Sequence, residues 1–393
     1  MADTESSPPG VEVGELLARA DAGEPILLLD VRNDDEYETW RLEGRRPIET
    51  VHIPYFDFIE DAAACVDRLP RNREIVVLCA KGGSSAMVVD TLRESGVASR
   101  NLAGGMIAYG EYLQPVKVPS GDPGLATWEM WQVNRRGKGC LSYVIRSGRE
   151  AIVVDASRDV SWYEEFVRGL RAAIVWVLDT HVHADHVSGG PALAARSGSP
   201  YFVSAGEGFE LWQHVTPLVN GQELRLGGEG GVTLEVRVMR TPGHTPGSSC
   251  YLVGRRHLLS GDTLFVKSVG RPDLGGQVDA WGRALFHTLR DGFATLSDDT
   301  VVLPAHYAGL DDVGPDGVVS ASLGTLRRTV PELQIREEEK FVAAMRAALK
   351  PPPAQYDEII RVNLGGATVD PEKATEWELG KNQCAAGTRH PAL

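Results

Sequence analysis

The chain has 393 residues and a formal net charge of −14, an acidic balance that excludes a general nucleic-acid binder, because such a protein needs a basic face. This length exceeds one comfortable hydrophobic core and predicts two domains plus an extension. No apolar run is long enough to cross a bilayer, and residues 1–5 do not have the pattern of a signal peptide.

Two apolar runs near the N-terminus, residues 27–32 and 74–78, predict buried strands of a parallel sheet. Helical patterns lie between and after them, including one over 85–94 with Met87, Val88 and Leu92 as predicted core positions. This alternation predicts a small α/β domain. The Pro- and Gly-rich stretch 114–124 predicts an ordered linker, so the first domain is expected to span 1–122.

The second of these strands leads directly into Cys79, within the glycine-rich segment Cys79-Ala80-Lys81-Gly82-Gly83-Ser84-Ser85. A cysteine in a loop between a strand and a helix faces backbone N–H groups and the positive end of the helix dipole. That setting favours thiolate and can hold an anionic sulfur species.

Residues 10–115 resemble a rhodanese-like domain. The resemblance rests on Asp30-Val31-Arg32, His52-Ile53-Pro54, the Cys79 loop, and Leu102-Ala103-Gly104-Gly105-Met106 with Tyr109. It implies that Cys79 accepts a sulfane sulfur and carries it as a persulfide. Such loops commonly have an arginine where this chain has Ser84, and Lys81 supplies a positive charge for substrate without replacing a bidentate guanidinium. Two interpretations stay open: transfer from another persulfide carrier, or a structural Cys79 in a regulatory domain.

Four further apolar segments predict strands, at 131–133, 141–145, 151–155 and 173–178. The last is expected to be buried, and it runs into Thr180-His181-Val182-His183-Ala184-Asp185-His186. Imidazoles and a carboxylate gathered at a strand end predict a metal-binding loop, because borderline divalent metals take those ligands. Asp155 is expected to orient this loop, and Asp159 to cap the helix that follows it.

More ligand types follow beside glycine or proline, at predicted strand edges. The seven candidate ligands are His181, His183, Asp185, His186, His244, Asp262 and His306. One possibility is that the site binds two metal ions. One ion would then be bound by His181, His183 and His244, the other by Asp185, His186 and His306, and Asp262 would bridge the two. A single Fe(II) is the other possibility, because two imidazoles and a carboxylate on one face leave three positions open. The ligand types alone do not decide between them.

The order His-x-His-x-Asp-His, His244, Asp262, His306 resembles the metallo-β-lactamase superfamily, over roughly Trp128 to Lys350. The resemblance implies an αβ/βα four-layer sandwich over 123–350. The expected fold class is therefore α/β and α+β, an N-terminal rhodanese-like α/β domain followed by the metallo-β-lactamase sandwich.

The segment after Asp262 contains Gly270-Arg271-Pro272-Asp273 and resembles the persulfide dioxygenase branch of that superfamily. The branch implies one Fe(II) per chain on His181, His244 and Asp262, with Arg271 binding glutathione persulfide. A simple Arg271–Asp273 ion pair is the alternative for that arginine. The remaining candidate ligands would bind a second metal or surround the first metal without binding it. These residues are His183, Asp185, His186 and His306.

The expected function is iron-dependent oxidation of glutathione persulfide, or a similar low-molecular-weight persulfide, by O2 to sulfite and thiol. Sulfane-sulfur transfer through Cys79 would be coupled to it. One alternative is a thioester hydrolase of the hydroxyacylglutathione type with two Zn ions, although His306-Tyr307 differs from the His-Glu-Tyr run expected there. Another is a persulfide-sensing protein with a weakly active metal domain.

The C-terminal part is predicted to contain a helix over 332–350, because Phe341, Val342, Met345 and Leu349 fall at helical spacing. An extension follows over 351–393, and its stretch from Tyr356 to Leu379 is expected to clasp the domain or a partner subunit. Five scattered cysteines indicate reduced thiols and a cytoplasmic protein. We expect a homo-oligomer whose partners are the persulfide and O2, with no nucleic acid or membrane partner.

Overall fold

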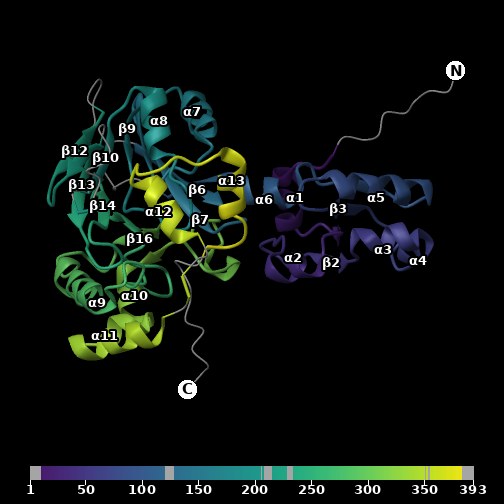
Figure 1. The fold of residues 1–393 in the computed structure, drawn as a ribbon. Helices are drawn as coiled ribbons and strands as arrows, with labels where there is room; N and C mark the ends of the chain where they lie inside the picture. The colour runs from purple at the N-terminus through teal and green to yellow at the C-terminus, as the bar shows by residue number, and fades with distance from the viewer. Residues whose placement is uncertain are drawn as a thin grey trace. The chain divides into compact units, whose positions relative to one another are not determined.

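The computed structural model describes residues 10–119, 128–204, 206–207, 215–227, 233–349, 351–352 and 355–382. The described residues belong to two compact units (Figure 1). One takes in those within Met1–Gln114, Arg135–Lys138 and Leu379–Lys381; the other takes in those within Pro115–Asn134, Gly139–Glu378 and Asn382–Leu393. None of the described helices has the length and apolar character that a membrane span requires.

The first unit is an α/β domain built on a parallel four-stranded sheet in the order β2-β1-β3-β4. Its elements are α1 (Val13–Ala22), β1 (Leu27–Asp30), α2 (Asp34–Thr39), β2 (Glu49–His52), α3 (Tyr55–Glu60), α4 (Ala62–Asp67), β3 (Ile75–Leu78), α5 (Gly83–Glu94), β4 (Ser99–Asn101) and α6 (Gly105–Glu111). The predicted parallel sheet is confirmed.

The apolar side chains of this sheet alternate between its two faces, as the period of a strand requires. Leu27, Leu29 and Val77 join one buried cluster, whereas Leu28 and Val76 join another on the opposite face. Both faces are therefore covered, which explains why β1 and β3 are continuous apolar runs.

The helix after Cys79 begins two residues earlier than predicted, at Gly83. Its buried positions include Ser85, Val88 and Leu92, so two predicted core positions are correct. Met87 is 58% exposed, and its assignment to the core was wrong. The helix buries the stripe that runs through Ser85, Val88 and Leu92, and Met87 lies about 100° away from Val88 around the axis.

The second unit contains two mixed sheets. The seven-stranded sheet has the order β11-β10-β9-β8-β7-β6-β5, and the six-stranded sheet has the order β12-β13-β14-β15-β16-β17. The strands are β5 (Leu113–Val118), β6 (Trp128–Arg135), β7 (Cys140–Ser147), β8 (Glu150–Val154), β9 (Ala173–Leu178), β10 (Tyr201–Ser204), β11 (Val215–Leu218), β12 (Glu223–Leu226), β13 (Leu234–Arg240), β14 (Ser249–Val253), β15 (His257–Gly261), β16 (Val301–Pro304) and β17 (Ala321–Ser322).

The two sheets share one buried apolar cluster, to which Tyr143 and Ile152 come from the first sheet and Val238 and Leu303 from the second. Helices cover the outer faces, with α7 and α8 against the first sheet and α9, α10 and α11 against the second (Figure 1). The helices are α7 (Val160–Gly169), α8 (Gly190–Ser197), α9 (Val278–His287), α10 (Leu323–Thr329) and α11 (Glu338–Ala347), and a π-helical turn (Thr288–Gly292) extends α9. The expected four-layer αβ/βα sandwich is confirmed.

Three local predictions need correction. The segment predicted as a linker begins with β5, which extends the first sheet of the sandwich, and the predicted boundary at residue 122 lies outside the described residues. Only the last two residues of β9 are buried. The helix predicted over 332–350 is a 3₁₀ turn (Pro331–Gln334) followed by α11, and Leu349, beyond the end of α11, is 41% exposed.

The C-terminal extension adds two helices to the second unit, α12 (Tyr356–Asn363) and α13 (Pro371–Trp377). Side chains at the ends of these helices, Asn363 and Glu378, hydrogen-bond to the loop after β9. The expectation that the extension clasps the domain is confirmed for its described residues.

Candidate metal centre

The histidine-rich loop after β9 is held by Asp155, which follows the last residue of β8. Asp155 has a left-handed backbone with φ of 55°, a conformation that aspartate tolerates better than most residues. Its Oδ1 accepts hydrogen bonds from the Thr180 amide at 2.7 Å and the Thr180 hydroxyl at 3.1 Å. Asp155 therefore fixes the first residue of the loop, as predicted.

Three predicted ligands meet at one point. His181 Nε2 and His244 Nε2 each lie 3.6 Å from Asp262 Oδ2. All three atoms are buried and have no hydrogen-bond partner among the described residues. Burying three unpaired polar atoms side by side is costly unless an ion joins them. Two imidazole nitrogens and a carboxylate oxygen fit a divalent transition metal.

The two histidines of this group are oriented by hydrogen bonds at their other ring nitrogen. His181 Nδ1 lies 2.9 Å from the Thr180 hydroxyl oxygen, and His244 Nδ1 donates to the Arg271 carbonyl at 2.8 Å. A proton on Nδ1 leaves the Nε2 lone pair of each ring for a metal. Burial lowers the pKa of both imidazoles, which favours the neutral, ligating form.

Asp262 is placed by the turn at the end of β15. Gly261 has φ of 52°, and a Cβ there would lie 2.7 Å from the Thr180 hydroxyl oxygen, so the close approach of the two loops requires glycine. Burial acts to raise the pKa of Asp262, but the neighbouring charge of His306 outweighs it and holds that pKa below its usual range. The carboxylate is therefore ionised and ready to ligate.

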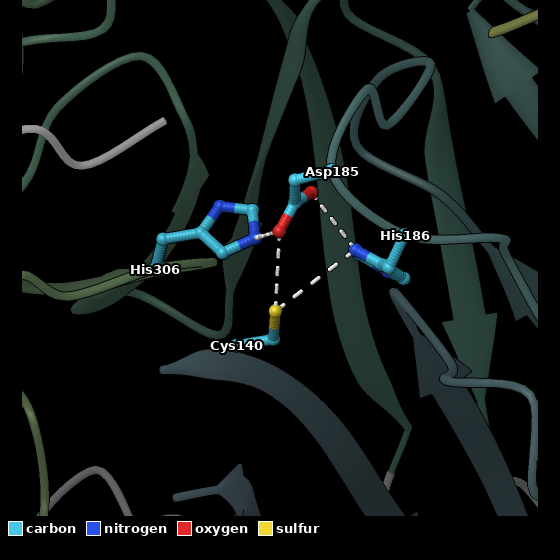
Figure 2. A group of neighbouring side chains, drawn as sticks. All are labelled: Cys140, Asp185, His186 and His306. Carbon is cyan, nitrogen blue, oxygen red and sulfur yellow. Dashed lines mark hydrogen bonds and ion pairs between the residues drawn. The ribbon is translucent and has the colours of Figure 1, made fainter. Parts of the chain in front are cut away.

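A second buried group lies next to the first and includes a cysteine. It consists of Asp185, His186, His306 and Cys140, whose donor atoms lie within 4.8 Å of one another (Figure 2). His306 connects the two groups, because its Nδ1 lies 2.6 Å from Asp262 Oδ1 and its Nε2 lies 3.2 Å from Asp185 Oδ2. Cys140 was absent from the predicted site.

His183 belongs to a third group, with Asp155 and Asp179. Its Nε2 lies 3.3 Å from Asp155 Oδ1. Burial opposes a charge on this imidazole, but the hydrogen bond and the charge of Asp155 raise its pKa to about 9. His183 is therefore directed towards carboxylates around the loop, and the structure does not place it in one donor group with His181 and His244.

The side chain of Arg271 forms two hydrogen bonds of 2.7 Å to the carboxylate of Asp273. These two bonds form the Arg271–Asp273 ion pair that the sequence analysis gave as the alternative role of this arginine. Both side chains are little exposed, at 11% for Arg271 and 13% for Asp273. The main chain of Arg271 orients His244, so the residue adjoins the first metal group whatever its side chain binds.

In the first unit, Cys79 lies directly after β3 and is buried. Its sulfur accepts hydrogen bonds of 3.1 Å from the Gly82 amide and from the Ser85 hydroxyl. Lys81 is exposed, and among the described residues it is not one of the donors to this sulfur. The loop thus provides two donors to the sulfur, one of which, the Ser85 hydroxyl, was not predicted.

Other residues of the candidate site that sequence reasoning missed are Cys140, Asn363 and the hydroxyl of Thr180. Thr180 stands beside the histidine motif, and its capacity to bond both Asp155 and His181 was a usable signal. Cys140 and Asn363 carry no such local signal, because each reaches the site only through the tertiary fold.

Comparison with known proteins supports this architecture. Residues 135–306 match the metallo-beta-lactamase superfamily, and residues 12–111 match the rhodanese-like domain. A hydroxyacylglutathione hydrolase from Acidiphilium cryptum is 33% identical over 187 residues, which cover 46% of this chain and 72% of that protein. The mitochondrial persulfide dioxygenase ETHE1 of Homo sapiens is 28% identical over 226 residues, which cover 56% and 80%.

Among solved structures, ETHE1 from Myxococcus xanthus superposes with a TM-score of 0.53 at 27% identity, over 61% of this chain and 99% of that one. A metallo-beta-lactamase from Staphylococcus aureus has a TM-score of 0.56 at 24% identity, over 62% and 75%, which supports the fold alone. The two expected domain families are confirmed. With its sandwich, its metal groups and these relatives, the chain belongs to the metallo-β-lactamase superfamily and carries a rhodanese-like domain on the N-terminal side of that fold.

Proposed function

We propose that the protein oxidises glutathione persulfide, or a similar low-molecular-weight persulfide, with O2. In the balanced reaction, one persulfide, one O2 and one water give one thiol and one sulfite with two protons. The S–S bond breaks, the outer sulfur is oxidised, and O2 is reduced. The similarity to persulfide dioxygenases supports this substrate class.

The observation that carries the proposal is the unpaired, buried group of His181 Nε2, His244 Nε2 and Asp262 Oδ2. These residues would hold one Fe(II). Iron bound by only three protein ligands supplies open coordination positions for a sulfur ligand and O2. The chain's own part is to keep both imidazoles neutral through burial and to direct them with Thr180 and the Arg271 carbonyl.

Two further residues complete the proposal. Arg271 would bind the anionic end of the glutathione moiety, because a guanidinium recognises carboxylate in a bidentate manner. Cys79 would exchange sulfane sulfur with a small persulfide: its thiolate attacks the outer sulfur, the carrier leaves as a thiol, and Cys79 becomes a persulfide. The Gly82 and Ser85 donors would stabilise the sulfur anion in that step.

The cysteines of the described residues suit a reducing compartment. Cys65, Cys79, Cys140 and Cys250 are all free thiols. A cytoplasmic location is therefore part of the proposal.

Oxygen uptake by anaerobically purified, iron-loaded protein tests the function, with metal content and sulfite measured on the same sample. Glutathione persulfide should drive O2 consumption with matching sulfite release, at about one iron per chain. His244→Ala should lose both iron and uptake. His287→Ala, which removes an exposed imidazole on α9, should retain both. Iron-loaded wild type that consumes no O2 would contradict the proposal.

A second candidate is a dizinc thioester hydrolase. The group of Asp185, His186 and His306 beside the first group favours it, as does the 33% identity to a hydroxyacylglutathione hydrolase. A bound hydroxide between two zinc ions would then be the nucleophile. Cleavage of a glutathione thioester by zinc-loaded protein, with no O2 uptake by the iron-loaded form, would favour this candidate.

A further inference from the structure

Cys140 lies among metal-ligand side chains although no recognised motif contains it. It is the first residue of β7, and an isolated antiparallel bridge pairs it with His306, which follows β16. Asp185 and His186 reach the same point from the loop after β9, so three separate segments supply the group (Figure 2). All four residues are buried.

Several donor atoms of the group lie close to the distances found in a coordination shell. Cys140 Sγ lies 3.3 Å from Asp185 Oδ2 and 4.0 Å from His186 Nδ1. Asp185 Oδ2 lies 3.2 Å from His306 Nε2, and Asp185 Oδ1 lies 2.9 Å from His186 Nδ1. Ligands around a tetrahedral zinc ion are roughly 3.3–3.6 Å apart, given metal–ligand distances of about 2.0–2.3 Å.

The ring of His306 has the orientation that a ligand needs. Its Nδ1 lies 2.6 Å from Asp262 Oδ1, an ionised carboxylate oxygen that accepts a hydrogen bond from the N–H. Nε2 faces the group that contains Cys140, 3.2 Å from Asp185 Oδ2, and presents a lone pair there once it has lost its proton. A metal-binding histidine is commonly held in this way, by a carboxylate at its other nitrogen.

We propose that Cys140 completes a closed, four-ligand zinc site with Asp185, His186 and His306. A thiolate, two imidazoles and a carboxylate are ligands that zinc takes in tetrahedral sites, and the thiolate and carboxylate together neutralise a divalent ion. On binding, the Cys140 thiol and the His306 imidazolium each release one proton to solvent, and no electron is transferred. Four protein ligands leave no open position, in contrast to the three-ligand group of His181, His244 and Asp262.

The closed site differs from the two-ion arrangement considered from the sequence, in which Asp262 bridges both ions. Here Cys140 supplies the ligand, while Asp262 Oδ1 faces the N–H of His306. Zinc would therefore act on the first group through His306, by holding the ring that orients Asp262. The inference goes beyond the proposed function and does not rest on it, because a closed zinc site leaves the three ligands of the first group unchanged. It is incompatible with the dizinc hydrolase, whose bound hydroxide needs an open position on both ions.

Cobalt substitution tests the site. Co2+ bound to a thiolate has a charge-transfer band in the near ultraviolet, whereas Co2+ bound only to nitrogen and oxygen lacks that band. Full-length protein is stripped of metal anaerobically and titrated with Co2+. The band should appear in wild type, persist in Cys79→Ser and Cys250→Ser, and be lost in Cys140→Ser. Cys250 is the matched control, since it is equally buried but hydrogen-bonds with Thr241 and the Ser260 carbonyl instead.

Zinc content gives a second readout that is independent of activity. A competing chelator should remove zinc from both proteins, but Cys140→Ser should lose its zinc at a chelator concentration at least tenfold lower than the one wild type requires. A missing band in wild type, or a band that survives in Cys140→Ser, overturns the inference. If Cys140→Ser does not fold, X-ray absorption is measured at the zinc edge of wild type, Cys79→Ser and Cys250→Ser. Sulfur among the zinc ligands of all three proteins supports the site, and zinc ligands of nitrogen and oxygen alone overturn it.

Discussion

The side-chain amide of Asn363 donates hydrogen bonds to the main-chain carbonyls of His183 at 2.8 Å and His186 at 2.9 Å. Its Oδ1 accepts from the Ser188 amide at 2.9 Å. Asn363 lies at the end of α12 in the C-terminal extension and is buried. One side chain of the extension therefore satisfies three main-chain groups of the metal-binding loop, which has little regular structure of its own to do so.

Asn363→Asp should weaken metal binding. The substitution keeps the shape and the acceptor for Ser188 but replaces two N–H donors with a carboxylate oxygen facing two carbonyls. We expect a loss of about 1–3 kcal/mol in the free energy of unfolding and a fall in metal affinity of about tenfold or more. Metal affinity is measured by chelator competition, and stability by thermal unfolding of the metal-free and metal-loaded protein.

Glu372→Ala, on the exposed side of α13, is the control and should leave both quantities unchanged within error. A metal affinity of Asn363→Asp equal to that of wild type would show that the loop holds its shape without the extension.

The ligand types of the first metal group could be predicted from sequence because each adjoins an apolar run. His181 follows β9 and Asp262 follows β15, so the sequence showed both the apolar run of each strand and the ligand residue beyond its end. The α/β fold of the first unit followed from the alternation of strands and helices, whereas the four-layer sandwich was implied by the resemblance that the motifs at strand ends carry.

Other features could not be predicted from local patterns. Cys140 reaches His306 through a single bridge between two segments that are far apart in the chain, and Asn363 reaches the loop through docking of the extension. Met87 was misplaced because a short helix with several apolar residues admits more than one buried face, and packing against the sheet decides between them.

Ser85→Ala should slow sulfur transfer through Cys79. The Ser85 hydroxyl is one of two hydrogen-bond donors to the Cys79 sulfur, and a hydrogen bond to a charged acceptor contributes about 1.5–3 kcal/mol. We expect the rate of persulfide formation on Cys79, followed by mass spectrometry, to fall by about tenfold or more. Ser84→Ala changes the adjacent hydroxyl, which is not among the hydrogen-bond donors to this sulfur in the described residues, and should react at the wild-type rate. Equal rates for the two variants would contradict the role of Ser85.

Glu207→Gln should flatten the dependence of stability on pH. Burial raises the pKa of Glu207 from 4.5 to about 7, although its Oε1 accepts a hydrogen bond from the Thr245 hydroxyl. The folded state then binds this proton more tightly than the unfolded state, so stability falls as pH rises from about 4.5 to about 7 and is level above that range. The fall amounts to at most about 3 kcal/mol.

The midpoint of chemical unfolding, measured between about pH 5 and about pH 8 by tryptophan fluorescence, checks this prediction. Glu207→Gln should lose less stability than wild type across that interval. Glu223→Gln, at an exposed position on β12, should keep the wild-type slope. Parallel slopes for wild type and Glu207→Gln would mean that another group causes the pH dependence.

Arg271→Met should raise the KM for glutathione persulfide by about tenfold to a hundredfold, the range that loss of one charged hydrogen-bonding group predicts. Iron content should be retained, because His244 bonds to the main-chain carbonyl of Arg271, which the substitution leaves in place. A purely structural ion pair with Asp273 predicts instead that Arg271→Met and Asp273→Asn lower the unfolding temperature equally and leave KM unchanged. Arg283→Met removes a more exposed guanidinium on α9 that is also paired with a carboxylate, and it should not alter KM. Steady-state O2 uptake over a range of persulfide concentrations therefore separates substrate binding by Arg271 from a role in holding the loop.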